Sequence, residues 1–180
     1  MRFWTVLLVW LLAGTALAAG KAAPETGPAV PGYGPVFPVP EGVFNLSNDR
    51  LYKVTKDVSA TGEKPDEINR GLESAARFLN MQARHGTRSD QLEMAVVVHG
   101  GAVKDLLTDE AYRSRFGIAN PNSGLLAGLG RAGVNVYLCG QTATNRGVAP
   151  GELNPNVTLA LSAMAAHVQL QSEGYTLIPF

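Results

Sequence analysis

Short apolar runs alternate with helical stripes along the chain from residue 51 onward. Alternating positions over residues 52–58 indicate a strand, and the nearly continuous apolar runs at 92–98 and 134–138 are typical of strands buried on both faces. A terminal strand is expected over 175–180. The pattern therefore predicts about four strands of the kind found in a parallel sheet.

The segments between these runs have helical spacing. One helix is expected to open at residues 64–67 and end at Gly86, another to start over 102–107, and a third to cover 124–132. A last long helix is expected to open at 154–156. Its buried face would carry Val157, Leu161, Met164 and Val168. Strands alternating with helices predict a three-layer, doubly wound α/β domain of flavodoxin-like type with a mostly parallel sheet.

The N-terminus reads as a cleavable secretory signal peptide over residues 1–18. Arg2 is followed by a mostly apolar run at 3–12 and by small residues ending at Ala18. An uncleaved membrane anchor is the alternative, but the apolar run is shorter than the ~20 residues that a span requires, and stable membrane insertion is not expected. Export to the periplasm follows from this interpretation.

Residues 19–50 are rich in Pro and Gly and are expected to form an extended linker or arm before the α/β domain at 51–180. Several apolar side chains lie toward the end of this arm. We expect them to pack on the domain or across a subunit interface. They include Val36, Phe37, Val43 and Phe44.

Charge and motifs exclude several classes of function. The chain has 15 basic and 15 acidic side chains and no basic stripe, so a nucleic-acid partner is not expected. The three histidines and one cysteine do not have metal-ligand spacing, and the glycines fit no phosphate-binding fingerprint. We therefore expect neither a metal site nor a cofactor.

Two of the predicted buried strands end in residues that can carry chemistry. His99 follows one strand and Cys139, the only cysteine, follows another. Ligands bind at the carboxyl ends of strands in open parallel sheets, and free N–H groups or an imidazolium beside a cysteine favour its thiolate. The candidate site consists of Cys139 and His99, with Gly100, Gly101, Gly140 and Gln141 as binding residues. The alternatives are an inert apolar cysteine that closes its strand and a structural histidine.

Several segments together resemble the DsrE/DsrF-like family, in its secreted branch. They occur in order, cover about residues 52–180, and include Ala95-Val96-Val97-Val98-His99-Gly100-Gly101-Ala102, Leu138-Cys139-Gly140-Gln141 and Leu170-Gln171-Ser172-Glu173-Gly174-Tyr175. The resemblance implies a flavodoxin-like fold, assembly into homo- or hetero-oligomers, and for some members a cysteine that carries persulfide sulfur between proteins. Cys139 would be the counterpart of that cysteine. The well-understood members are cytoplasmic, whereas this chain reads as exported.

The sequence therefore favours a periplasmic sulfur- or thiol-handling carrier rather than a turnover enzyme. Cys139 would bear the sulfur, His99 would assist proton movement, and a sulfur donor or acceptor protein would be the partner. The alternative is a non-catalytic oligomeric module that binds a small ligand and whose cysteine is structural. A thiol-redox enzyme is a third possibility, but a single cysteine cannot resolve a disulfide without a partner.

Overall fold

Five parallel strands form one sheet in the computed structural model of the chain, which describes residues 22–179. The predicted signal peptide, residues 1–18, lies outside the described residues. The strand order is β4-β3-β2-β1-β5. The strands are β1 (Tyr52–Val58), β2 (Leu92–Val98), β3 (Asn135–Cys139), β4 (Val157–Ala160) and β5 (Thr176–Ile178).

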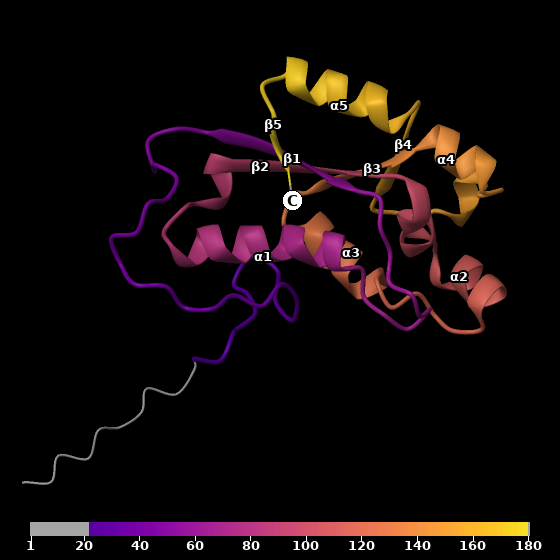
Figure 1. Cartoon of the computed structure of the whole chain (residues 1–180), viewed down its shortest axis with the longest axis horizontal. Coiled ribbons are helices and arrows are strands. Elements are labelled where there is room, and N and C mark those ends of the chain that lie inside the picture. Colours follow the sequence, from indigo (N-terminus) through magenta and orange to yellow (C-terminus); the bar gives the residue numbers. More distant parts are fainter. Residues whose placement is uncertain (1–21, 180) are drawn as a thin grey trace, which may run out of the picture.

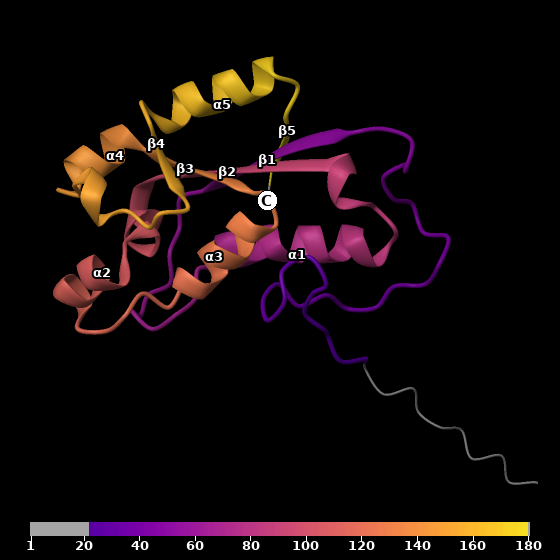
Figure 2. The same ribbon diagram turned by 180° about the vertical axis from the view of Figure 1, so that it is seen from behind.

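Helices cover both faces of this sheet. The two opposite views place α1 and α3 together on one face and α5 on the other, and α2 and α4 beyond the carboxyl ends of the strands (Figures 1 and 2). The helices are α1 (Arg70–Arg84), α2 (Asp109–Phe116), α3 (Ser123–Arg131), α4 (Gly140–Asn145) and α5 (Ala163–Ser172). The expected three-layer α/β fold with a parallel sheet is confirmed.

Helix α1 begins later than the sequence predicts. It was expected to open at 64–67, but it starts at Arg70, because the Oδ1 atom of Asn69 accepts the backbone N–H groups of Gly71 and Leu72 at 2.8 and 3.1 Å. Such an N-cap satisfies donors that have no partner within the helix. Leu72, with Ala75, Ala76 and Leu79, is buried against the sheet, so the predicted apolar stripe is present.

The prediction of one long helix from residues 154–156 is wrong. Asn154 Oδ1 accepts the N–H of Asn156 at 3.0 Å in a local turn, and the next residues form strand β4, which pairs in parallel with β3. The helix starts only after Ser162, whose hydroxyl accepts the N–H of Ala165 at 3.0 Å. As a result, Leu161, Met164 and Val168 are exposed instead of buried.

The connection between β2 and α3 also differs from the prediction. The helix expected to start over 102–107 is a 3₁₀ segment, Gly100–Leu106, and a separate helix, α2, follows it. Asp105 is fully buried here, and its carboxylate accepts the side-chain amide of Asn69 at 2.6 Å and the Lys104 ammonium at 3.0 Å. This network ties the 3₁₀ segment to the start of α1 at the carboxyl end of the sheet.

The N-terminal arm is bound to α1 over much of its described length. The buried Asn80 side chain accepts the N–H of Val30 at 2.7 Å and donates to the carbonyl oxygens of Tyr33 and Gly34 at 2.8 and 3.1 Å. Val36 is buried as well, as we expected. In contrast, Phe37, Val43 and Phe44 are exposed large apolar side chains in the single chain, so the other half of the expectation, packing across a subunit interface, stays a prediction.

Candidate functional site

Three polar side chains meet at the carboxyl ends of β1, β2 and β3, on the face that α5 covers. The register pairs Asp57 with Val97, and Val98 with Leu138, so His99 and Cys139 lie at the same level. Alternate residues of a strand point to the same face. Asp57, His99 and Cys139 therefore point toward α5, and α5 adds His167 from its own inner side.

Cys139 is the last residue of β3 and the N-cap of α4. Its side chain is only 6% exposed, and burial alone would raise the pKa of the thiol. The sulfur nevertheless accepts hydrogen bonds from the Thr142 hydroxyl and from the backbone N–H groups of Thr142, Ala163 and Gln141. These donors outweigh burial, so the pKa of Cys139 lies below its ordinary value and the thiolate is favoured.

Asp57 links both histidines of the site. Its Oδ1 and Oδ2 atoms lie 3.1 and 3.0 Å from Nε2 of His99, and Oδ1 lies 2.8 Å from Nε2 of His167. Burial would raise the pKa of the Asp57 carboxyl, but the hydrogen bonds from His167 and His99 outweigh it and lower this pKa. Asp57 is therefore an ionised acceptor at neutral pH.

These side chains line one pocket with a volume of about 280 Å³. Its wall is completed by Gln141, Thr142, Ser162, Ala163 and Met164. One ring atom of the pocket residue His167, Nδ1, is buried and has no hydrogen-bond partner among the described residues. The pocket therefore combines a thiol that favours ionisation, two imidazoles and a carboxylate, which is a set suited to thiol chemistry with proton transfer.

The predicted binding residues are only partly brought together. Gln141 lines the pocket, whereas Gly100 and Gly101 pack against Ser59. Gly100 has φ +58°, a conformation that favours glycine, and it turns the chain after His99. A Cβ atom on Gly140 would lie 2.6 Å from the carbonyl oxygen of Ala160, so glycine permits the close approach of α4 to the end of β4. The N–H donors to the sulfur come from Gln141, Thr142 and Ala163, not from Gly140.

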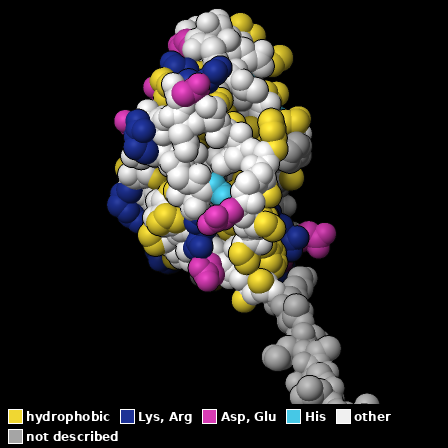
Figure 3. Space-filling model, turned by 90° about the vertical axis from the view of Figure 1, so that its left-hand side faces the viewer, with side chains coloured by type: hydrophobic (Ala, Val, Ile, Leu, Met, Phe, Trp, Pro, Cys, Tyr) yellow, Lys and Arg dark blue, Asp and Glu magenta, His cyan; other side chains and the backbone are white. Residues whose placement is uncertain are grey.

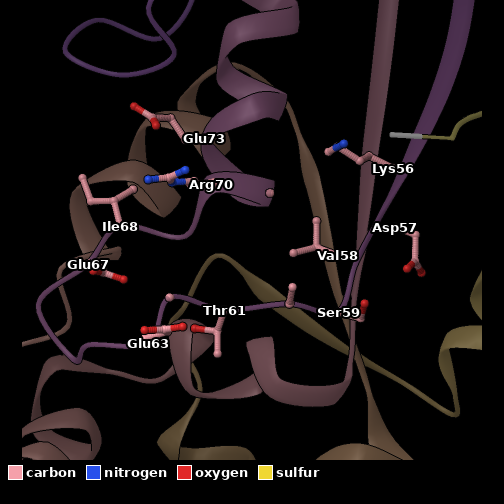
Figure 4. A pocket seen from close by; sticks show the side chains of 13 residues that line it. Lys56, Asp57, Val58, Ser59, Thr61, Glu63, Glu67, Ile68, Arg70 and Glu73 are labelled. Carbon is pink, nitrogen blue, oxygen red and sulfur yellow. The ribbon is translucent and has the colours of Figure 1, made fainter.

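A larger pocket of about 770 Å³ opens between the end of β1 and the start of α1 (Figure 4). Its wall mixes acidic and basic side chains, among them Glu67, Arg70 and Glu73. Asp57 contributes to both pockets, but Figure 4 shows its side chain on the opposite side of β1 from Arg70 and Glu73. The residues that line this larger pocket include neither cysteine nor histidine, so the smaller pocket is the candidate functional site.

Other kinds of site find little support in residues 22–179. The end of the molecule shown in Figure 3 carries basic and acidic side chains interspersed with apolar ones. Within the described part of the chain, no three or more His, Cys, Asp or Glu side chains group in a way that could hold a metal ion. None of the helices described there has the length and apolar character needed to cross a membrane.

Sequence reasoning missed three residues of this site: Asp57, Thr142 and His167. Aspartate is uncommon inside strands, so Asp57 at the end of the Tyr52–Val58 strand was a usable signal. His167 lies within the long helix predicted from residues 154–156, and its role depends on where α5 begins. The Thr142 hydroxyl acts on Cys139 only because α4 starts immediately after the cysteine.

Comparisons with known proteins agree with this fold. The chain resembles a solved structure of a protein of unknown function, MTH1491 from Methanobacterium thermoautotrophicum, with a TM-score of 0.53 and 22% identity over 71% of this chain and 97% of that one. No curated protein matches the sequence. The model of the DsrE/DsrF-like family matches residues 38–180, which include every residue of the pocket. The chain therefore belongs to the DsrE/DsrF-like family, which is generally related to sulfur relay.

Proposed function

We propose that this chain is a periplasmic sulfur- or thiol-handling protein that carries sulfur as a persulfide on Cys139. The observation that carries the proposal is the environment of the sulfur. One hydroxyl and three backbone N–H groups donate to the sulfur at the carboxyl edge of the parallel sheet. A thiolate is the form of cysteine that attacks sulfane sulfur, and these donors lower the pKa of the thiol and so increase its thiolate fraction.

The pocket has room for the additional sulfur atom of a persulfide. A persulfide adds one sulfur atom about 2.0 Å beyond Sγ, and a volume of about 280 Å³ adjoins Cys139. His99 and His167 both line this volume, so two imidazoles border the space that the terminal sulfur would enter. The sequence has no second cysteine, and a sulfur donor or acceptor must therefore come from another molecule. This favours a carrier over a thiol-redox enzyme.

Export is part of this proposal. It is supported by Arg2, the apolar run at 3–12 and the small residues that end at Ala18. We expect the mature chain to begin near Ala19 and to occur in the soluble periplasmic fraction. N-terminal sequencing of the exported protein tests this, and Met1 retained on that protein contradicts it.

Assembly into a homo-oligomer is supported by exposed apolar side chains beside the pocket. Met164 and Val168, one turn apart on α5, are 78% and 69% exposed, and Leu161 precedes the helix. A groove of about 350 Å³ between β4 and α5 continues this surface. Contiguous exposed apolar surface of this kind marks interaction sites. We call Leu161, Met164 and Val168 the α5 patch.

One observation favours the alternative, a non-catalytic binding module with a structural cysteine. Cys139 belongs to a small apolar cluster with Ala95, Val97 and Ala163, and its side chain is almost fully covered. A purely structural thiol would resist modification until the protein unfolds. The hydrogen-bond donors around the sulfur favour the carrier, because an apolar packing role does not need them.

Intact-mass analysis distinguishes these two functions. The folded protein is incubated with glutathione hydropersulfide, and the carrier is expected to gain the mass of one sulfur atom on Cys139. The Cys139→Ser variant is the control, because it changes little in size and is expected to fold and to gain nothing. If the wild-type protein gains no sulfur and its thiol reacts with iodoacetamide only after unfolding, the carrier function is wrong and the binding module remains.

A further inference from the structure

We propose that His167 is the acid–base group of the Cys139 pocket and that Asp57 is its positioning residue. The proposal rests on the persulfide function of Cys139 and assigns the proton transfers that this function needs. Sequence reasoning gave such a role to His99 alone. Three observations on α5, Asp57 and the buried ring atom of His167 carry the assignment.

The first observation is the position of His167 on α5. Its residue number is four higher than that of Ala163, so the two share one face of the helix. The backbone N–H of Ala163 donates to the sulfur of Cys139. Helical side chains lean toward the N-terminus and cover the preceding turn. The imidazole of His167 is therefore directed toward the turn that contacts the sulfur, and both residues line the same pocket.

The second observation fixes the tautomer. Nε2 of His167 lies 2.8 Å from Oδ1 of Asp57, and an ionised carboxylate can only accept hydrogen bonds. Nε2 therefore carries the proton, and in the neutral ring Nδ1 holds the free lone pair. A carboxylate that orients an imidazole in this way leaves the opposite nitrogen available as a base.

The third observation is that Nδ1 of His167 is buried and has no hydrogen-bond partner among the described residues. Buried polar atoms are nearly always paired, and an unpaired one calls for an explanation. The missing partners include the Cys139 sulfur, so a proton would pass between Nδ1 and the sulfur through one water molecule or substrate atom in the pocket that both residues line. His99 is less suited, because its side chain is 34% exposed against 17% for His167.

The proposed sulfur transfer needs only the hydropersulfide as a second reactant, and its atoms and electrons balance. His167 Nδ1 takes the proton of the Cys139 thiol. The resulting thiolate attacks the outer sulfur of R–S–SH, so the Cys139 S–S bond forms as the R–S bond to that sulfur breaks. The leaving thiolate R–S⁻ then takes the proton from the His167 imidazolium. The net reaction converts Cys139–SH and R–SSH into Cys139–SSH and R–SH, and neither an oxidant nor a reductant is consumed.

Few other charges face His167. Asp57 approaches from β1, His99 from the end of β2 and Cys139 from the end of β3, while β4 and α4 contain no acidic or basic residue. Farther along the α5 face of the sheet, Glu93 pairs with Lys53 and accepts a hydrogen bond from Tyr175, and Tyr137 packs there too. The pH dependence of sulfur loading should therefore report on the four titratable residues of the pocket, Asp57, His99, Cys139 and His167.

The test is the rate of sulfur loading as a function of pH, followed by intact mass with glutathione hydropersulfide. The His167→Gln variant keeps an amide that can donate to Asp57 but cannot take up a proton. We expect its loading rate at pH 7 to fall by about 10²-fold, the low end for general acid–base catalysis. The rate should recover as the pH rises and hydroxide ionises the thiol. His85→Gln, a change at the end of α1 far from the pocket, is the matched control and should load like the wild-type protein.

Each outcome decides the assignment. A His167→Gln profile equal to that of the wild-type protein, or lowered by the same factor at every pH, overturns the role of His167 and leaves the carrier function intact. A wild-type protein that gains no sulfur at any pH overturns the carrier function itself, and this role with it. Circular dichroism checks folding. If His167→Gln does not fold, Asp57→Asn replaces it, and a loading profile unchanged by that variant also overturns the assignment.

Discussion

Asp57 and His167 are 110 residues apart in the sequence, yet Oδ1 of the aspartate lies 2.8 Å from Nε2 of the histidine. This contact connects the end of β1 directly to the helix that covers the sheet. The same carboxylate also holds His99. One acidic side chain therefore fixes the two imidazoles of the Cys139 pocket, and its ionisation should be coupled to the stability of the fold.

The first prediction concerns this coupling. The pKa of Asp57 is lower in the folded chain than its ordinary value of 3.8, because the hydrogen bonds from His167 and His99 outweigh burial. Folding then favours the ionised form, so the stabilisation is fully present above the unfolded value and is lost as the pH falls through the lower, folded value. We expect the wild-type protein to exceed Asp57→Asn in free energy of unfolding at pH 7, and the difference to shrink below about pH 4.

Urea unfolding of both proteins between pH 7 and pH 3 measures this difference. Asp66→Asn is the matched control, since Asp66 is exposed in the loop before α1 and makes no hydrogen bond or ion pair in the described structure. The control should follow the wild-type protein at every pH. A difference between wild-type and Asp57→Asn that stays constant down to pH 3 would show that Asp57 acts only through packing.

The second prediction concerns Thr142, whose hydroxyl donates to the sulfur of Cys139. Thr142→Val removes this donor with little change in shape, so the pKa of the thiol should rise toward its ordinary value. A hydrogen bond to a charged group contributes about 1.5–3 kcal/mol, so the midpoint of the alkylation profile should move up by about one pH unit or more. The rate of iodoacetamide reaction between pH 5 and pH 10 measures the midpoint.

Thr144→Val is the control for this variant, because Thr144 lies on the same short helix, is exposed and does not donate to the sulfur. It should leave the midpoint where it is in the wild-type protein. Equal midpoints for all three proteins would mean that the hydroxyl does not act on the thiol. A wild-type midpoint at or above the ordinary value of about 8.5 would remove the basis for a favoured thiolate altogether.

The sequence predicted the central strands well because their signal is local. Continuous apolar runs such as 92–98 mark strands buried on both faces, and these runs placed His99 and Cys139 at the same edge of the sheet. The last helix was misplaced because Pro155 and the spacing from Val157 to Val168 imitate a helix start and stripe. Strand β4 lies at the edge of the sheet, and its pairing with β3, a non-local interaction, decides its structure.

The candidate site was predicted in part for the same reason. Cys139 and His99 can be found from the ends of their own strands. Asp57 and His167 become recognisable as site residues only through their contact with each other. Their contact depends on the path of α5, which crosses the sheet from β4 to β5. The arm shows the same limit, because the Asn80 side chain that holds it lies 50 residues away from Val30.

The last prediction concerns assembly through the α5 patch. Val168 is 69% exposed in the single chain, so Val168→Glu should leave the thermal unfolding of the chain nearly unchanged. If a second copy covers the patch, the new charge would be buried without a partner and assembly should fail. We expect the wild-type protein to sediment as an oligomer and Val168→Glu as a monomer in analytical ultracentrifugation. Ser114→Glu, at an exposed position on α2, adds the same charge away from the patch and should remain assembled. A monomeric wild-type protein, or a Val168→Glu variant that stays assembled, rules out this surface as the interface.

Because Met164 belongs both to the patch and to the wall of the Cys139 pocket, a monomeric variant with altered sulfur loading would place the entrance of the site at the subunit contact.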